Sequence, residues 1–284
     1  MIATCEPMVM TAEEYHADLS RDSHSSLDLF RESRERYAML RIHRNVKAKP
    51  ATVAQEYGGE CHLYVLEPEL FASHFEVGDG PINPATGRPY GRTSQKYAAW
   101  AESVGRPVIT SERLEELEAM RAGIMRNEFA RDALESSGLV ERVFHWEDEL
   151  TGLPLKCRPD KLLDSGLVVD LKTSSRDISP DGFARTIEKM GYHRQAALYL
   201  DGLDANGIAA TNFAFIVVDT EFPHECAVHE IGERSIEAGR RQNRRTLDEL
   251  ARCRRENDWS GRWRGDLVKV DISEWALKRE GVLE

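Results

Sequence analysis

Apolar residues recur every three to four positions through the first half of the chain, which is the spacing of one helix face. Thr11 and Glu14 have the spacing of a capping box, so a short helix is expected to begin there. A later helix is expected to end at Glu67, because a residue that precedes proline is pushed out of the helical region. The pattern predicts helices over residues 11–19, 27–40, 52–66, 93–104, 111–126 and 128–137.

The segment 78–92 interrupts this helical pattern. It contains four glycines and three prolines, so we expect a long loop. Loops of this length inside a compact domain are usually functional or mobile.

The periodicity changes after residue 137. Strands are expected over 139–150, 153–163 and 167–173, with turns at Thr151-Gly152 and Asp164-Ser165-Gly166. The remaining pattern predicts helices over 180–189, 191–205 and 233–256, and strands over 211–219 and 224–231. This order predicts an α/β protein with a mixed sheet and a helical N-terminal portion.

The predicted elements divide the chain into three portions of one domain, 1–284. Residues 1–137 are mainly helical, 138–231 form the sheet core, and 232–284 form a C-terminal helix and tail. Length alone would also fit two domains.

Composition narrows the class of protein. Hydrophobic residues make up 41% and charged residues 31%, which excludes a mostly disordered chain. No run approaches the ~18 apolar residues of a membrane span. The first residues carry no secretory signal, so we expect a cytoplasmic protein that does not bind membranes. A net charge of −11 argues against a generally basic DNA-binding surface but leaves room for a local basic groove.

The five cysteines are widely spaced and form no C-x-x-C pair. A disulfide framework, a zinc ribbon and an iron–sulfur cluster are therefore poorly supported, and reduced thiols are expected. The cysteines are Cys5, Cys61, Cys157, Cys226 and Cys253.

Three charged residues cluster around the turn at 164–166. Asp160 and Asp170 lie on neighbouring predicted strands that a short hairpin would bring side by side, and Lys172 shares a strand face with Asp170. Two carboxylates and an ammonium group suit a hard divalent cation such as Mg²⁺, which can activate water to attack a phosphodiester. The alternative is a surface salt bridge. The apolar run Leu167-Val168-Val169 favours a site, because charges that continue a buried strand are costly.

At these residues the chain resembles the PD-(D/E)XK nuclease superfamily, through Pro159-Asp160 and Asp170-Leu171-Lys172. More narrowly, it resembles the exodeoxyribonuclease VIII (RecE-type) exonucleases of phage and prophage recombination. Three further segments carry this likeness, which covers roughly residues 11–220, and segment 25–37 fits more loosely. They are residues 61–68 (CHLYVLEP), 151–160 (TGLPLKCRPD) and 191–199 (GYHRQAALY).

The resemblance implies a restriction-endonuclease-like α/β core with a mixed central sheet flanked by helices. It also assigns roles to particular residues. The implied metal ligands are His62, Asp160, Asp170 and the carbonyl of Leu171, and the implied catalytic residues are Asp160, Asp170, Lys172, Gln195 and Tyr199. Tyr192 shares the helix face of Gln195 and Tyr199, and plain core packing is the alternative role for both tyrosines. Many superfamily members add an upstream glutamate, for which Glu141, Glu147 and Glu149 are all candidates.

Two basic segments are candidates for contact with DNA. Residues 240–255 hold seven arginines and two acidic residues, a local charge of +5. Arg240/Arg244 and Arg241/Arg245 are like-charge pairs that phosphates would relieve, although a solvated helix face explains them equally well. Arg88, Tyr90 and Arg92 in the loop 78–92 form the second candidate, suited to a frayed strand end.

By resemblance, the expected function is that of a Mg²⁺-dependent exodeoxyribonuclease, with Mn²⁺ as an alternative cofactor. It would degrade one strand of linear duplex DNA from the 5′ end and leave 3′ single strands for a partner annealing protein in recombination. A ring-like homo-oligomer is also implied. The alternatives are a structure- or sequence-specific endonuclease on the same core, or a catalytically silent DNA-binding scaffold.

Overall fold

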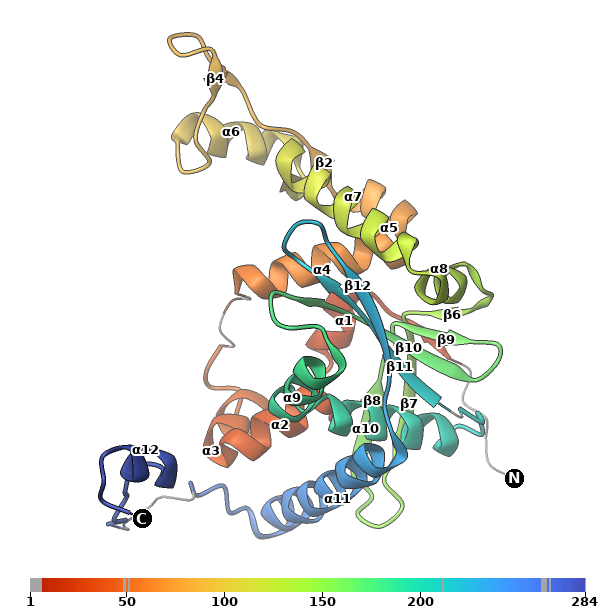
Figure 1. The fold of residues 1–284 in the computed structure, drawn as a ribbon, viewed down its shortest axis with the longest axis vertical. Helices are drawn as coiled ribbons and strands as arrows, with labels where there is room; N and C mark the ends of the chain where they lie inside the picture. The colour runs from red at the N-terminus through yellow and green to blue at the C-terminus, as the bar shows by residue number, and fades with distance from the viewer. Residues whose placement is uncertain are drawn as a thin grey trace.

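The central element of the computed structural model is a five-stranded sheet (Figure 1). The structure describes residues 7–47, 50, 52–210, 212–261, 265 and 267–283. The strand order is β12 (Cys226–Glu230), β11 (Asn212–Asp219), β10 (Leu167–Ser174), β9 (Lys161–Leu163) and β6 (Gly138–Val140). β10 and β11 run parallel and the other neighbours antiparallel, so the expected mixed sheet is confirmed.

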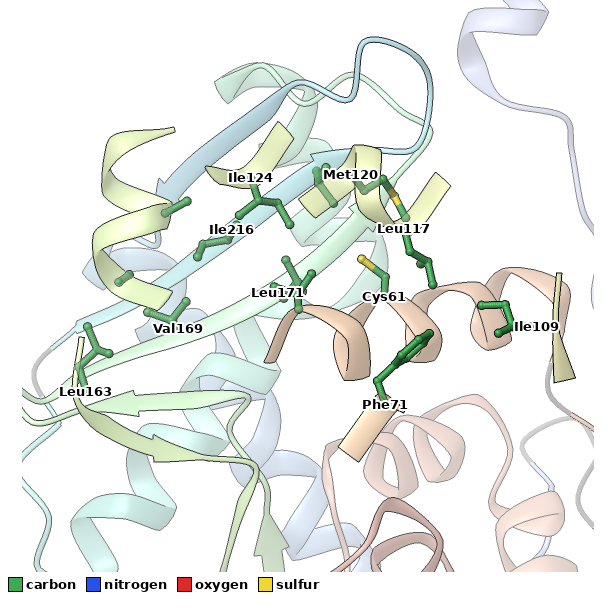
Figure 2. Close-up of a cluster of buried hydrophobic side chains, with 14 residues drawn as sticks. Cys61, Phe71, Ile109, Leu117, Met120, Ile124, Leu163, Val169, Leu171 and Ile216 are labelled. Atoms are coloured by element: carbon green, nitrogen blue, oxygen red, sulfur yellow. The ribbon is translucent and has the colours of Figure 1, made fainter. Parts of the chain in front are cut away.

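Helices cover both faces of this sheet. One face packs on α4 (Val53–Leu66), α7 (Ser111–Arg126) and α8 (Glu128–Glu135), and the other on α9 (Pro180–Met190) and α10 (Tyr192–Ala205). Val169 and Leu171 of β10 point into the first core, which Figure 2 shows together with Cys61 of α4. Val168 points into the second core beside Phe213 and Phe215. Successive side chains of β10 therefore point to opposite faces of the sheet.

A second, three-stranded antiparallel sheet contains β1 (Met8–Val9), β7 (Arg142–Glu147) and β8 (Pro154–Cys157). α1 (Ala12–Ala17) follows β1 and starts at the predicted capping box. A third apolar cluster joins β8 and α10 to α2 (His24–Glu32), α3 (Arg34–Tyr37) and α11 (Glu233–Glu256). The long C-terminal helix therefore anchors the N-terminal helices.

Two predicted strands are in fact four. The expected strand 139–150 is split at Glu141, whose φ of 51° lies in the left-handed region, and its halves join different sheets. The expected strand 153–163 is likewise split between Cys157 and Lys161. Strand periodicity continues through both bends, so the sequence pattern alone shows one long strand where the chain crosses between sheets.

The helical prediction is wrong in one place and incomplete in another. The expected helix 27–40 breaks at Ser33, which is extended and caps α3, and the chain then continues as a π-helical segment, Ala38–Ile42. α4 ends before Pro68 as predicted, but α5 (Pro68–His74) begins at once, because proline is tolerated in the first turn of a helix. The helices expected over 111–126 and 233–256 match α7 and α11.

The loop 78–92 belongs to an arm that extends from the body (Figure 1). The strands β2 (Glu76–Val77) and β5 (Val108–Ile109) pair at its base. Beyond them lie the hairpin β3 (Ile82–Asn83) and β4 (Arg88–Pro89), and α6 (Gln95–Val104). The predicted loop thus contains a short hairpin.

A last helix, α12 (Glu274–Arg279), lies in the tail and was not predicted. Cys61, Cys157, Cys226 and Cys253 are free thiols as expected, while Cys5 lies outside the described residues. Within the described part of the chain, none of the helices combines the length and apolar character that a bilayer crossing requires.

Candidate active site

Three acidic residues form a row across three neighbouring strands. The β9–β10 ladder pairs Val169 with Lys161, so one further step of the same register brings Asp170 opposite Asp160. The β6–β9 ladder similarly leads to Glu141 opposite Asp160, where the Glu141 N–H donates to the Asp160 carbonyl at 3.0 Å. Residues in register on adjacent strands share one face of a sheet. The expected proximity of Asp160 and Asp170 is therefore present, and Glu141 extends the row.

His62 reaches this row from α4, which packs on the same sheet. Its Nδ1 lies 3.3 Å from Oδ2 of Asp160. One ligand atom each from His62, Glu141 and Asp160 lies within 4.8 Å of the other two, a spacing that can hold a metal ion. Two carboxylates and a neutral imidazole are a donor set that fits a divalent cation.

The sequence offered three candidates for an upstream glutamate, and the structure distinguishes them. Of the three candidates, Glu141 alone joins the cluster, whereas Glu147 and Glu149 have exposed side chains at the far end of β7 and in the turn after it. Strand periodicity could not separate the three, because Glu141, Glu147 and Glu149 are alternate positions of one predicted strand and would share a face.

Asp170 is the most buried member of the site, with a side chain 1% exposed. One of its carboxylate oxygens forms an ion pair with the Lys172 ammonium group. The other accepts a hydrogen bond of 3.0 Å from Nε2 of Gln195 on α10. Lys172 also lies over the ring of Tyr192, 4.8 Å from its centroid. Gln195 thus contacts the site through Asp170, and Tyr192 contacts it through Lys172.

Burial and mutual repulsion set the charges in the site. Burial, reinforced by the charge of Asp160, raises the pKa of Glu141 to about 8 and that of Asp170 to about 7. Burial alone would lower the pKa of Lys172, but the carboxylates of Asp170 and Asp160 raise it above its ordinary value. Burial lowers the pKa of His62, which favours the neutral imidazole that binds metals. A bound cation would relieve the repulsion among the carboxylates.

The Leu171 backbone lies at the same point. Its N–H donates to Oδ2 of Asp160 at 2.7 Å, and its backbone hydrogen-bonds His62, which raises the pKa of that imidazole against the effect of burial. The Leu171 side chain is buried in the first core, on the face of the sheet that α4 covers. The main chain of Leu171, whose carbonyl is one of the predicted ligands, therefore lies beside Asp160 and His62.

Arg158 is a site residue to which the sequence analysis gave no role. Its guanidinium forms an ion pair of 2.5 Å with Oε2 of Glu141, and both side chains are nearly buried. Its signal in the sequence was its position in R-P-D, two residues before Asp160. Arg158 offsets part of the negative charge of the site.

Tyr199 lies deeper in the protein than the other candidates. Its ring packs against Phe213, and burial raises its pKa well above the ordinary value. No hydrogen bond joins its hydroxyl to a site residue within the described chain. The packing role that was its alternative accounts for these contacts.

The arginines of α11 are largely engaged in ion pairs. Arg240 pairs with Asp201, Arg241 with Glu237, and Arg244 with both Asp148 and Asp248. Arg245 is exposed and has no ion-pair partner among the described residues. The like-charge repulsion along this helix is thus relieved within the chain.

The two loop arginines lie on the arm. Arg88 is exposed on β4, and the Arg92 guanidinium stacks 6.0 Å from the ring centroid of Tyr97 on α6. The charge of Arg92 acts to lower the pKa of Glu60 on α4, and among the described residues neither arginine forms an ion pair with Glu141, Asp160 or Asp170.

The fold and this site define a PD-(D/E)XK nuclease-like domain with a restriction-endonuclease-like core. A family model described as a PDDEXK-like domain of unknown function (DUF3799) matches residues 23–265, and the chain belongs to this family. None of the curated proteins compared with the chain matches it.

Three solved structures are similar to the chain. A candidate exonuclease from Eubacterium rectale is 16% identical, with a TM-score of 0.62 over 95% of this chain and 98% of that one, and it shows the same fold. The protein SSO0001 is 18% identical, with a TM-score of 0.31 over 61% of this chain and 70% of that one. An alkaline exonuclease from Laribacter hongkongensis is 12% identical, with a TM-score of 0.23 over 58% and 89%.

Proposed function

We propose that this protein is a Mg²⁺-dependent exodeoxyribonuclease of the RecE type, formed by one domain that spans the chain. The observation that carries the proposal is the meeting of His62, Glu141 and Asp160 within 4.8 Å, beside the Asp170–Lys172 ion pair. A catalytically silent scaffold would gain nothing from burying these charges together, because their burial costs free energy.

Each residue of the site has a chemical task in this proposal. His62, Glu141 and Asp160 hold the cation, with Asp170 and the Leu171 carbonyl as neighbouring oxygen donors. When bound, Mg²⁺ supplies water activation and neutralises charge on the scissile phosphate. Lys172 remains an ammonium group, which suits it to stabilise developing negative charge rather than to remove a proton. Gln195 fixes the orientation of Asp170, and Arg158 that of Glu141.

The finer parts of the proposal rest on the family resemblance. The protein acts on the ends of linear duplex DNA, degrades one strand from 5′ to 3′, and leaves 3′ single strands for an annealing protein. A ring-like homo-oligomer would keep the enzyme on one strand. The basic residues of α11 and of the arm are the proposed DNA contacts, with the unpaired Arg245 the most available of them.

The test compares linear duplex with covalently closed circles of the same sequence, with and without Mg²⁺. Digestion of the linear form alone, and only with the cation, supports the exonuclease. Cutting of closed circles would instead identify an endonuclease, and binding without cleavage in any divalent cation would identify a scaffold. End-labelling of each strand separately reads the polarity.

A further inference from the structure

A basic hollow of about 260 Å³ lies at the carboxyl end of β10, between the segment that follows this strand and the helix α9. The hollow is lined by Arg176, Asp177, Gly182, Arg185, Thr186 and Lys189.

The side chains that line the hollow carry a net positive charge. Three cations face one carboxylate, that of Asp177, which lies 3.3 Å from Arg185 and accepts the Ser179 N–H at 2.9 Å. Among the described residues, Arg176 and Lys189 have no ion-pair partner. Most arginines of α11, by contrast, are paired with acidic neighbours. The hollow therefore offers positive charge that an external anion can use.

The hollow adjoins the proposed active site along the strand itself. Lys172 and Ser174 are alternate residues of β10, and the Arg176 N–H donates to Oγ of Ser174 at 3.1 Å. Four residues of extended chain span at most about 14 Å. Tyr192 lies within electrostatic range of both places. Burial raises the pKa of its phenol, whereas the positive charges of Lys172 and Arg176 each lower it.

We propose that this hollow binds backbone phosphates of the DNA strand that enters the active site. The inference rests on the proposed nuclease function and adds the path of the substrate. Arginine presents forked donors that match phosphate oxygens, and lysine adds a point charge. Since phosphates follow each other at 3.4 Å per strand along duplex DNA, the hollow contacts linkages within about four positions of the scissile one.

The segment before α9 packs closely against the start of that helix. A Cβ at Gly182 would lie 2.2 Å from the Asp177 side chain, so the segment 176–179 packs directly on the first turn of α9. Arg176 comes from this segment and Arg185 from α9, so two elements supply the arginines that line the hollow.

The test replaces the three cations together, Arg176→Gln, Arg185→Gln and Lys189→Gln. A matched control replaces three solvent-accessible basic residues that lie elsewhere, Arg36→Gln, Arg131→Gln and Arg279→Gln, with the same change in net charge. Binding to linear duplex is measured against salt concentration, with Ca²⁺ in place of Mg²⁺ to prevent cleavage. The hollow variant should bind roughly tenfold or more weakly, with a log–log salt slope shallower by about 2 to 3, and the control should match wild type. Equal slopes in the two variants would overturn the inference.

A second measurement locates the contact. Neutral methylphosphonate linkages are placed one at a time along the strand. Those within about four positions of the cleaved bond should weaken wild-type binding but leave the hollow variant unchanged. An equal loss in both proteins would place the phosphate path elsewhere.

A small substrate separates this inference from the proposed function. The hollow variant should hydrolyse bis(p-nitrophenyl) phosphate at the wild-type rate with Mn²⁺, because that molecule is too short to reach the hollow. If wild type hydrolyses neither this ester nor DNA, the nuclease proposal fails. If wild type is active and the hollow variant binds DNA normally, the inference alone fails.

Discussion

The backbone N–H of Glu141 donates to the carbonyl oxygen of Asp160 at the place where both strands leave the central sheet. The two residues lie one step beyond the ladder of β6 and β9, where the chain passes between the central sheet and the three-stranded sheet. The bend places Glu141 in the left-handed region at φ 51°, an unfavourable conformation for a residue with a Cβ. The carboxylate of this strained residue is also the one that joins His62 and Asp160 in the proposed metal site.

Removal of one proposed ligand should abolish metal binding while the fold remains. We expect Asp160→Asn and His62→Ala each to lower Mg²⁺-dependent cleavage by about a hundredfold or more, since both supply ligand atoms of one cluster. Mn²⁺ affinity measured by calorimetry should fall in parallel, and circular dichroism should be unchanged. Glu147→Gln, on an exposed residue of the same strand region, is the control. Normal Mn²⁺ affinity in Asp160→Asn would refute the ligand assignment.

Lys172→Ala should reduce turnover by about a hundredfold or more while DNA affinity stays within a few fold of wild type. The ammonium group is held by Asp170 and Tyr192, where it can act on charge that develops in the transition state. Single-turnover rates and binding in Ca²⁺ measure the two effects separately. A large loss of affinity with normal turnover would instead make Lys172 a phosphate anchor.

At position 141 the usual stability order of alanine and glycine should be reversed. Both Glu141→Ala and Glu141→Gly remove the carboxylate and its ion pair with Arg158, but only glycine adopts φ 51° without strain. The glycine variant should therefore have a free energy of unfolding about 1 kcal/mol greater than the alanine variant. Urea unfolding in EDTA provides the comparison. Both variants should be inactive, and greater stability of the alanine variant would show that the bend relaxes.

The metal-free protein should lose stability as the pH rises from about 5 to about 8. In the unfolded chain the carboxyl groups of Glu141 and Asp170 ionise near 4.5 and 3.8, but burial raises their pKa values in the folded protein to about 8 and about 7. The folded state then holds more protons than the unfolded state across this window, so the free energy of unfolding falls with pH.

Thermal unfolding in EDTA at several pH values measures this slope. Glu141→Gln should flatten it, because the variant has lost one of the two titrating groups, whereas the exposed Glu147→Gln should leave it unchanged. An identical slope in Glu141→Gln and wild type would mean that Glu141 is already ionised in the folded protein.

Two adjacent arginines of α11 should affect different properties: Arg244 the stability of the fold, and Arg245 the binding of DNA. Arg244 makes three hydrogen bonds of 2.8 to 3.0 Å to Asp148, so Arg244→Glu should lower the free energy of unfolding by about 2 kcal/mol. Arg245→Glu should leave stability unchanged and, if α11 contacts DNA, should weaken binding and reduce its salt slope by about 1. Stability is read from urea unfolding, and binding from titrations in Ca²⁺. An unchanged slope in Arg245→Glu would remove α11 from the DNA surface.

Much of the secondary structure follows from the sequence because it depends on local preferences. The helices α7 and α11 and the strand β10 are set by apolar periodicity, capping residues and turn signals that lie within each segment. The approach of Asp160 to Asp170 also follows, since a short hairpin fixes the register of its two strands. Lys172 follows in the same way, because it lies two residues after Asp170 on one strand and shares its face, whereas His62 was identified only through the family resemblance.

Tertiary structure decided what depends on segments far apart in the chain. Glu141 could be distinguished from Glu147 and Glu149 only by the bend between two sheets, and no local pattern marks that bend. Arg240 and Arg244 form ion pairs with Asp201 and Asp148, which are distant in the sequence. Only the packing of α11 therefore shows that the charges of these arginines are already neutralised. Local hydrogen bonding and periodicity thus determined where the elements form, whereas long-range packing determined which charges meet.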